Sequence, residues 1–201
     1  MRSRPQRMRR CAVRFSTPIL AMARLLGVVC VALALGSASA AHAAEVRPGD
    51  PLPLVSVTDW SGRSFNLAQL RGQVVVIDFW ASWCATCRAA LPALDAISQR
   101  HPELAVVAIN IDKSRAPAEH FLTEHLPQAR MLLLRDPDAA ALARFGAAGM
   151  PALYVVDRDG VVQHAEAGYA VDRLSVLEAM IDNLLHPAVA TSAGAGESLP
   201  Q

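Results

Sequence analysis

Two cysteines separated by two residues, Cys84 and Cys87, are the residues best suited to carry out chemistry in this sequence. The other two, Cys11 and Cys30, lie in a basic and apolar leader, so the rest of the chain holds only this pair. A lone pair at this spacing is not the disulfide framework of a small secreted domain. It indicates thiol–disulfide exchange, in which one thiolate attacks a partner's disulfide and the second thiol releases the product.

The elements around the pair predict which cysteine attacks. Residues 74–80 form a β-branched and aromatic run, typical of a strand buried on both faces, and a helical pattern follows from about residue 85 to residue 100. Cys84 would then lie at the helix N-terminus, where free N–H groups and the helix dipole can lower a cysteine's pKa from about 8.5 to about 3.5–7.5. We therefore predict that Cys84 attacks and that Cys87, one turn inward, resolves the mixed disulfide.

Asp78 is the only charged residue in the predicted buried strand. Burial would raise the pKa of its carboxyl, and a carboxylate near the cysteines could accept the proton that Cys87 must lose. The alternative is a structural ion pair between Asp78 and an arginine. The nearby cysteines favour the catalytic interpretation.

The rest of the pattern predicts an α/β fold with a central mixed sheet flanked by helices. Strand, helix and strand at 74–80, 85–100 and 104–111 form a βαβ unit with a parallel pair. An N-terminal β-hairpin precedes this unit, and an inserted helix at 116–126 follows it. A strand at 131–134 comes next, followed by a helix that is opened by Asp136 and Pro137 and stops at Gly146. The last elements are a hairpin of 152–156 and 161–165 and a helix with an apolar stripe from Leu174 to Leu184.

Residues 76–84, Val-Ile-Asp-Phe-Trp-Ala-Ser-Trp-Cys, followed by Cys87, resemble the active-site segment of thioredoxin-fold proteins. Pro92 falls where that family kinks its first helix, and Gly149-Met150-Pro151 is similar to its cis-proline loop. The resemblance implies that Pro151 packs against the cysteines and that the backbone of Met150 pairs with a bound substrate. Trp83, beside Cys84, is the tryptophan expected to touch a partner.

The leader, the hairpin and the extra segment 113–126 look most like the TlpA/ResA/DsbE branch of these proteins. The resemblance implies an envelope thiol–disulfide oxidoreductase that reduces exported proteins such as apocytochrome c or copper-site proteins. It also implies regeneration by a membrane electron carrier of the CcdA/DsbD type, with no cofactor beyond the redox-active disulfide. We expect a monomer.

Two features depart from that branch. Its cytochrome-maturation members have an acidic residue where Lys113 aligns here, with Asp112 beside it. Between the cysteines stand Ala85 and Thr86, which match neither strongly reducing nor strongly oxidising relatives. The substrate and the direction of electron flow therefore stay open at this point.

The ends of the chain predict its location. Residues 1–44 carry seven arginines and no acid, and the apolar run 25–35 is shorter than the roughly 20 residues needed to cross a bilayer. We expect a signal peptide over 1–44, an uncleaved anchor being the alternative, a thioredoxin-like domain over 45–186 and a disordered tail over 187–201. The protein would be periplasmic or held at the outer face of the inner membrane. Without the leader, twelve basic residues face eighteen acidic ones, which disfavours nucleic acid as a partner.

Other chemistries of the cysteine pair are weaker. A zinc site needs a second pair of ligands, and His120 and His125 do not have a metal-binding spacing, so we expect no metal. A peroxidase of this fold would have a threonine where Ala81 stands. The strongest alternative is a Cu(I) metallochaperone, because two thiolates with the Met150 thioether could hold Cu(I).

Overall fold

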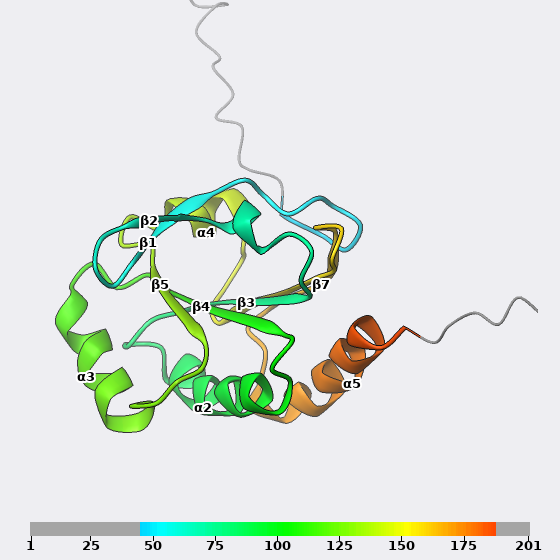
Figure 1. Ribbon diagram of the computed structural model, residues 1–201. Helices are drawn as coiled ribbons and strands as arrows, with labels where there is room; N and C mark the ends of the chain where they lie inside the picture. Colours follow the sequence, from blue (N-terminus) through cyan, green and yellow to red (C-terminus); the bar gives the residue numbers. More distant parts are fainter. Residues whose placement is uncertain (1–44, 188–201) are drawn as a thin grey trace, which may run out of the picture. The chain divides into compact units, whose positions relative to one another are not determined.

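The computed structural model describes residues 45–187 (Figure 1). Seven strands form a single sheet in the order β2-β1-β5-β4-β3-β6-β7. The strands are β1 (Ser56–Asp59), β2 (Ser64–Asn66), β3 (Val75–Trp80), β4 (Ala105–Asn110), β5 (Leu132–Arg135), β6 (Ala152–Val156) and β7 (Val162–Ala167). The helices are α2 (Ala85–Arg100), α3 (Arg115–His125), α4 (Ala140–Phe145) and α5 (Leu174–Leu185), with 3-10 turns η1 (Leu67–Leu70) and η2 (Val171–Arg173).

The sheet is mixed, as the sequence predicted. Strand β3 pairs in parallel with β4, and β4 in parallel with β5, whereas β6 and β7 run antiparallel. The predicted N-terminal hairpin is β1 and β2 at one edge of the sheet, and the predicted inserted helix is α3. The predicted bounds of β3 to β7 and of α2, α3 and α5 agree with the observed ones to within two residues. The signal-peptide prediction over 1–44 and the predicted tail beyond residue 187 lie outside the described residues.

Two apolar layers cover the sheet, one on each face (Figure 1). Helices α2, α3 and α5 pack on one face, and η1 and α4 pack on the other. Alternate residues of β3 serve the two layers: Val76 and Trp80 lie in the α2 layer, and Ile77 and Phe79 in the α4 layer. Every residue of β3 is buried, so the strand lies at the centre of the fold.

Helix α2 carries a proline in its second turn. Pro92 has no N–H, so the Arg88 carbonyl lacks its usual helical donor. The helix nevertheless continues to Arg100, because Leu91 and Leu94 on its inner face are completely buried against the sheet. The first turn of α2, which carries both cysteines, is thereby fixed to the edge of a rigid layer.

The prediction for the start of α4 was partly wrong. Asp136 does cap the helix, because its carboxylate accepts the N–H groups of Ala140, Ala141 and Leu142 at 3.0, 2.9 and 3.1 Å. Pro137, however, lies in a turn before the helix rather than in its first turn. Ala139 adopts a left-handed conformation (φ 52°), which delays the first helical residue to position 140.

Replacing the Asp136 cap should destabilise the domain. Asp136→Ala leaves three N–H groups at the partly buried start of α4 without their acceptor, and we expect the free energy of unfolding to fall by about 1–3 kcal/mol. Urea denaturation of the folded domain measures this change. Asp138→Ala, an exposed neighbour, is the control and should change the free energy by less than about 0.5 kcal/mol. Equal effects of both substitutions would contradict the capping role.

Candidate active site

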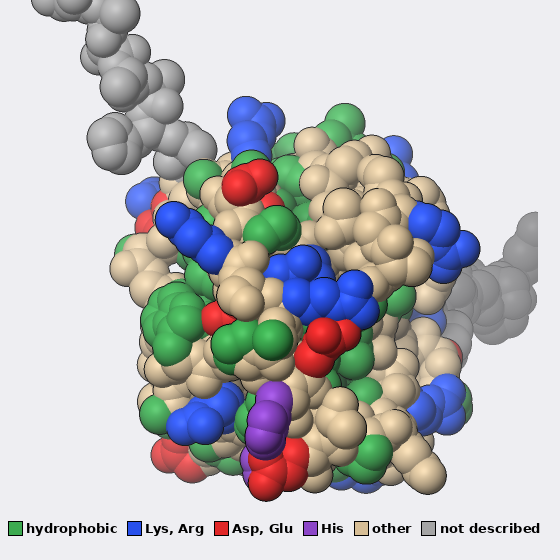
Figure 2. All heavy atoms as spheres, turned by 90° about the vertical axis from the view of Figure 1, so that its left-hand side faces the viewer, with side chains coloured by type: hydrophobic (Ala, Val, Ile, Leu, Met, Phe, Trp, Pro, Cys, Tyr) green, Lys and Arg blue, Asp and Glu red, His purple; other side chains and the backbone are tan. Residues whose placement is uncertain are grey.

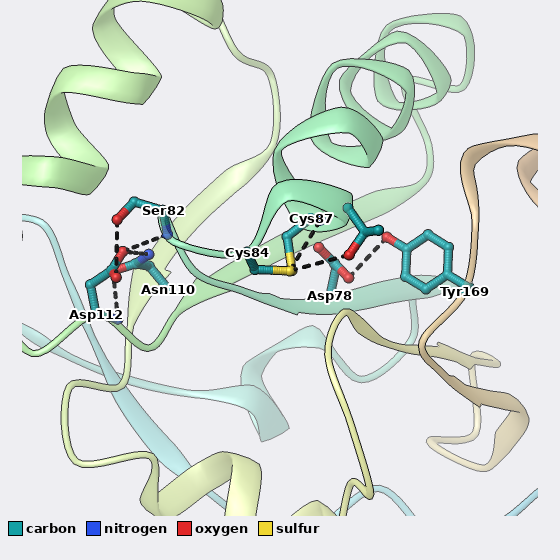
Figure 3. The surroundings of a disulfide bond; sticks show 8 residues. Asp78, Ser82, Cys84, Cys87, Asn110, Asp112 and Tyr169 are labelled. Atoms are coloured by element: carbon teal, nitrogen blue, oxygen red, sulfur yellow. Dashed lines mark hydrogen bonds between the residues drawn. A yellow bond between two sulfur atoms is a disulfide. The ribbon is translucent and has the colours of Figure 1, made fainter.

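Cys84 and Cys87 form a disulfide at the start of α2, with their Cα atoms 5.3 Å apart (Figure 3). Cys84 is the N-cap residue, and its sulfur accepts the backbone N–H of Cys87 at 3.2 Å. The Thr86 hydroxyl lies 3.4 Å from the same sulfur. Cys84 keeps 8% of its surface exposed, whereas Cys87 has none. The arrangement therefore presents Cys84 to a partner and shields Cys87.

Asp78 lies on the same face of the sheet as the cysteines. It stands between Val76 and Trp80 in β3, and both of these belong to the apolar cluster that contains Cys84 and Cys87. Its neighbours in the adjoining strands are Ala108 of β4 and Leu153 of β6, neither of which is polar. Figure 3 shows the Asp78 carboxyl between the disulfide and the ring of Tyr169.

The environment of Asp78 favours its protonated form. The side chain is fully buried, and this burial raises the pKa of the carboxyl well above its usual range, while a hydrogen bond from Tyr169 opposes the rise. The Tyr169 hydroxyl donates to Oδ1 at 3.0 Å, and Oδ2 is buried with no partner. No arginine pairs with Asp78 within residues 45–187, so the structure shows no ion pair of the predicted kind in that range.

Sequence reasoning missed Tyr169. It lies in the connection after β7, 91 positions from Asp78, and its side chain is buried. An isolated tyrosine following a glycine gives no local signal of a polar contact across the fold. The available hint was Asp78 itself, because a buried carboxyl needs a hydrogen-bond partner somewhere in the chain.

A second buried carboxylate, Asp112, fixes the segment before the cysteines (Figure 3). It accepts the Ser82 N–H at 2.8 Å, the Ser82 hydroxyl at 3.1 Å and the Asn110 amide at 2.7 Å. Arg135 donates to its carbonyl at 3.0 Å. The sequence singled out Asp112 only as the neighbour of Lys113. The network ties the end of β4 to the turn between β3 and α2, so Asp112 positions the loop that leads to Cys84.

The structure describes all three predicted substrate-binding residues, Trp83, Met150 and Pro151. The Met150–Pro151 peptide bond is cis, as the resemblance implied, and Met150 packs against the cluster that contains both cysteines. The Pro151 carbonyl accepts the Gly168 N–H at 2.7 Å, but within the described part of the chain no hydrogen bond takes up the backbone N–H or carbonyl of Met150. Trp83 is 68% exposed.

An open groove of about 710 Å³ extends from Trp83. Lys113 and Ser114 line one side of it, and Pro137 and Asp138 line another. The residue that departs from the cytochrome-maturation pattern, Lys113, thus borders a surface beside the reactive cysteine. With Lys113 and Asp138 both present, the groove carries charges of both signs.

The α3 side of the molecule shows interspersed basic, acidic and histidine side chains (Figure 2). His120 and His125 are both exposed and both lie near Glu124, at 3.3 and 3.7 Å. Over residues 45–187, no group of three or more His, Cys, Asp or Glu side chains is placed to hold a metal ion. In the same range, no helix has both the length and the apolarity required to cross a membrane.

Comparison with known proteins identifies the family. The family model described as Redoxin matches residues 47–181, which is most of the domain. The chain belongs to the Redoxin family. Two curated relatives and one solved structure make the relationship more specific.

The thiol-disulfide oxidoreductase ResA of Bacillus thuringiensis is 24% identical over 120 residues, 59% of this chain and 68% of that protein. The thiol:disulfide interchange protein DsbE of Yersinia pestis is 30% identical over 129 residues, 63% of this chain and 67% of that protein. A crystal structure of a proposed DsbE from Chlorobium tepidum is 29% identical with a TM-score of 0.65, covering 70% of this chain and 99% of that one. This Redoxin protein is therefore a thioredoxin-fold protein-disulfide oxidoreductase of the ResA/DsbE type.

The burial of Asp78 predicts a pH-dependent stability. Its pKa is raised in the folded protein above the value of about 3.9 in the unfolded chain, so the folded state binds the proton more tightly. The free energy of unfolding should therefore fall as the pH rises from about 4 through the raised pKa. Asp78→Asn removes this titration and should be more stable than the native protein at pH 8, with little difference near pH 4.

Urea denaturation of both oxidised proteins between pH 4 and pH 8.5 measures this difference. A constant difference across the whole range would show that Asp78 does not carry the titration.

Proposed function

We propose that this Redoxin protein is a reductant of the cell envelope that transfers electrons to disulfides in exported proteins, with apocytochrome c and copper-site proteins as its substrate classes. One observation carries the proposal: a fully buried Cys87 has, on its own face of the sheet, a buried carboxyl with an unpartnered oxygen. A resolving thiol that can be deprotonated is what a reductant requires, because its second step forms its own disulfide.

The reaction begins at Cys84. Its sulfur accepts the Cys87 N–H at the start of α2 in the oxidised protein. In the reduced protein the Cys84 thiolate, favoured by this helix N-terminus, attacks one sulfur of the substrate disulfide. A mixed disulfide forms and the first substrate thiolate leaves. The Cys87 thiol then gives its proton to Oδ2 of Asp78 in its ionised, carboxylate form, and the resulting thiolate attacks the sulfur of Cys84. The Cys84–Cys87 disulfide forms, the second substrate thiolate leaves, and two electrons have passed to the substrate.

Substrate binding follows from the groups around Cys84. The free N–H and carbonyl of Met150 can pair with an extended substrate segment next to its cysteine. The exposed ring of Trp83 offers an apolar surface beside it, and Pro151 holds the loop against the β7 end through Gly168. These contacts use backbone and ring surface, which suits substrates of varied sequence.

The oxidised protein must be reduced again for each turnover. We propose that a membrane electron carrier of the CcdA/DsbD type supplies the two electrons through its own dithiol, and that the cysteine pair is the only redox group. Export through the leader over residues 1–44 would place the domain on the side of the membrane where such substrates occur. The same contacts around Cys84 would bind the carrier and the substrate one after the other. We propose that the protein does this as a monomer.

Trapping a mixed disulfide tests the roles of the two cysteines. We expect reduced Cys87→Ser to accumulate a covalent complex with a peptide that carries a Cys-x-x-Cys-His disulfide, because the second step is blocked. Cys84→Ser, the matched control, should form at least about 100-fold less complex, because Cys87 is fully buried. Non-reducing electrophoresis and mass spectrometry measure both. Equal trapping by the two variants would contradict the assignment.

Replacing Asp78 separates reduction from the Cu(I) alternative. Asp78→Asn should slow the release of the second product by about 100-fold at pH 7, because the proton acceptor is lost. Cu(I) binding by the two thiolates would not change with this substitution. Turnover unaffected in Asp78→Asn, together with tight Cu(I) binding, would favour the metallochaperone instead.

A further inference from the structure

Tyr169 contacts the one carboxyl that the proposed reaction uses as a proton acceptor. Its hydroxyl donates to Oδ1 of Asp78 at 3.0 Å, and both side chains are buried. The bond is the only side-chain contact that fixes the orientation of the Asp78 carboxyl among the described residues. Strands β4 and β6 offer Ala108 and Leu153 at the neighbouring positions, and these cannot form hydrogen bonds through their side chains.

The two oxygens of Asp78 are therefore unequal. Oδ1 is engaged by Tyr169, whereas Oδ2 is buried and free. Figure 3 shows the free oxygen on the side of the carboxyl that is turned toward α2 and Cys87. A carboxyl held by one oxygen cannot rotate without breaking a buried hydrogen bond, which is unfavourable because both groups would lose their partner.

We propose that Tyr169 is a positioning residue for thiol–disulfide exchange: by donating to Oδ1 it directs Oδ2 of Asp78 to Cys87 and sets the pH range in which Asp78 can accept the Cys87 proton. This inference rests on the proposed role of Asp78 in the reaction. Tyr169 acts through Asp78 and does not touch the reacting sulfurs.

Tyr169 remains a neutral donor throughout the pH range in which the protein works. Burial is the main cause that raises the pKa of its hydroxyl, and the charge of Asp78, the hydrogen bond to it and the charge of Glu166 raise it further. Tyr169 borders a cavity of about 10 Å³ together with Leu153, His164, Glu166 and Arg173. His164, Glu166 and Arg173 are the charged and titratable side chains of β7 and η2 that line this cavity, whereas Asp172 of η2 does not line it. His164 Nε2 lies 3.2 Å from Glu166 Oε2. From α2, the groups that face Asp78 are the two cysteines.

The hydrogen bond from Tyr169 stabilises the ionised state of Asp78, and this decides in which direction its loss shifts the pKa of Asp78. A hydroxyl donor favours the Asp78 carboxylate over the neutral acid, so its loss raises the pKa of Asp78 still further. Less carboxylate is then present at a given pH below that pKa. The acidic limb of the resolution step should move to higher pH by roughly one unit when Tyr169 becomes Phe.

Stopped-flow reaction of the reduced protein with the chromogenic disulfide dithionitrobenzoate measures this. The first coloured thiolate leaves when Cys84 attacks, and the second leaves when Cys87 resolves the mixed disulfide. In Tyr169→Phe we expect the pH profile of the second phase to move upward by about one unit, while the first phase keeps its profile. Tyr154→Phe is the matched control, because Tyr154 is equally buried but lies in the opposite apolar layer.

A second measurement keeps the ring and the fold intact. Tyr154 and Tyr169 are the two tyrosines of the chain, so 3-fluorotyrosine incorporated into Tyr154→Phe labels Tyr169 alone. Its more acidic hydroxyl is a stronger donor, and the acidic limb of the second phase should move to lower pH. Opposite shifts in the two proteins are the result that a merely structural role of Tyr169 would not produce.

Three outcomes decide the matter. The inference is supported if the pH profile of the second phase moves upward in Tyr169→Phe and downward in the fluorotyrosine protein, and if neither shift occurs when Asp78→Asn is also present. Unshifted profiles in both Tyr169 proteins, with Asp78→Asn slow, overturn the inference and leave the proposed function standing. A second phase in Asp78→Asn as fast as in the native protein overturns the role of Asp78 and the inference with it.

Discussion

The complete burial of β3 is the constraint on which the site depends. The strand pairs with β4 on one side and β6 on the other, and helices cover both of its faces. Because successive side chains of β3 point to opposite faces of the sheet, Asp78 lies on the α2 face. The end of the strand at Trp80 fixes where the turn to Cys84 begins. A shift of one residue in its register would move Asp78 to the opposite layer, away from the cysteines. The position of this one strand therefore sets the geometry of the reaction.

The same fold gives the two cysteines different surroundings. Cys84 lies at the end of the α2 layer, at a helix N-terminus with some exposure, and Asp112 holds the preceding loop in place through Ser82. Cys87 lies one turn deeper, completely buried, on the Asp78 side. Burial disfavours an ionised Asp78, so the domain gives up stability at neutral pH to keep a proton acceptor in an apolar layer.

Local sequence patterns predicted the elements well because each leaves a periodic signal. The apolar run of β3, the helical stripe after Cys84 and the single charge at Asp78 were all legible, and so was the hairpin at the N-terminal edge. Contacts between distant residues left no such signal. Tyr169 reaches Asp78 across 91 positions and Asp112 reaches Ser82 across 30, and both pairs depend on how the layers pack. The prediction of where α4 starts failed for a related reason. The left-handed conformation of Ala139 is imposed by the turn before the helix, and alanine has no intrinsic preference for it.

The central claim is that the fold makes two thiols of one Cys-x-x-Cys pair chemically unequal. A brief pulse of iodoacetamide on the fully reduced protein at pH 7, followed by peptide mass spectrometry, compares their reactivities directly. The account predicts that Cys84 is alkylated at least about tenfold faster than Cys87, because it combines exposure with a helix N-terminus. Equal rates, or faster modification of Cys87, would contradict it.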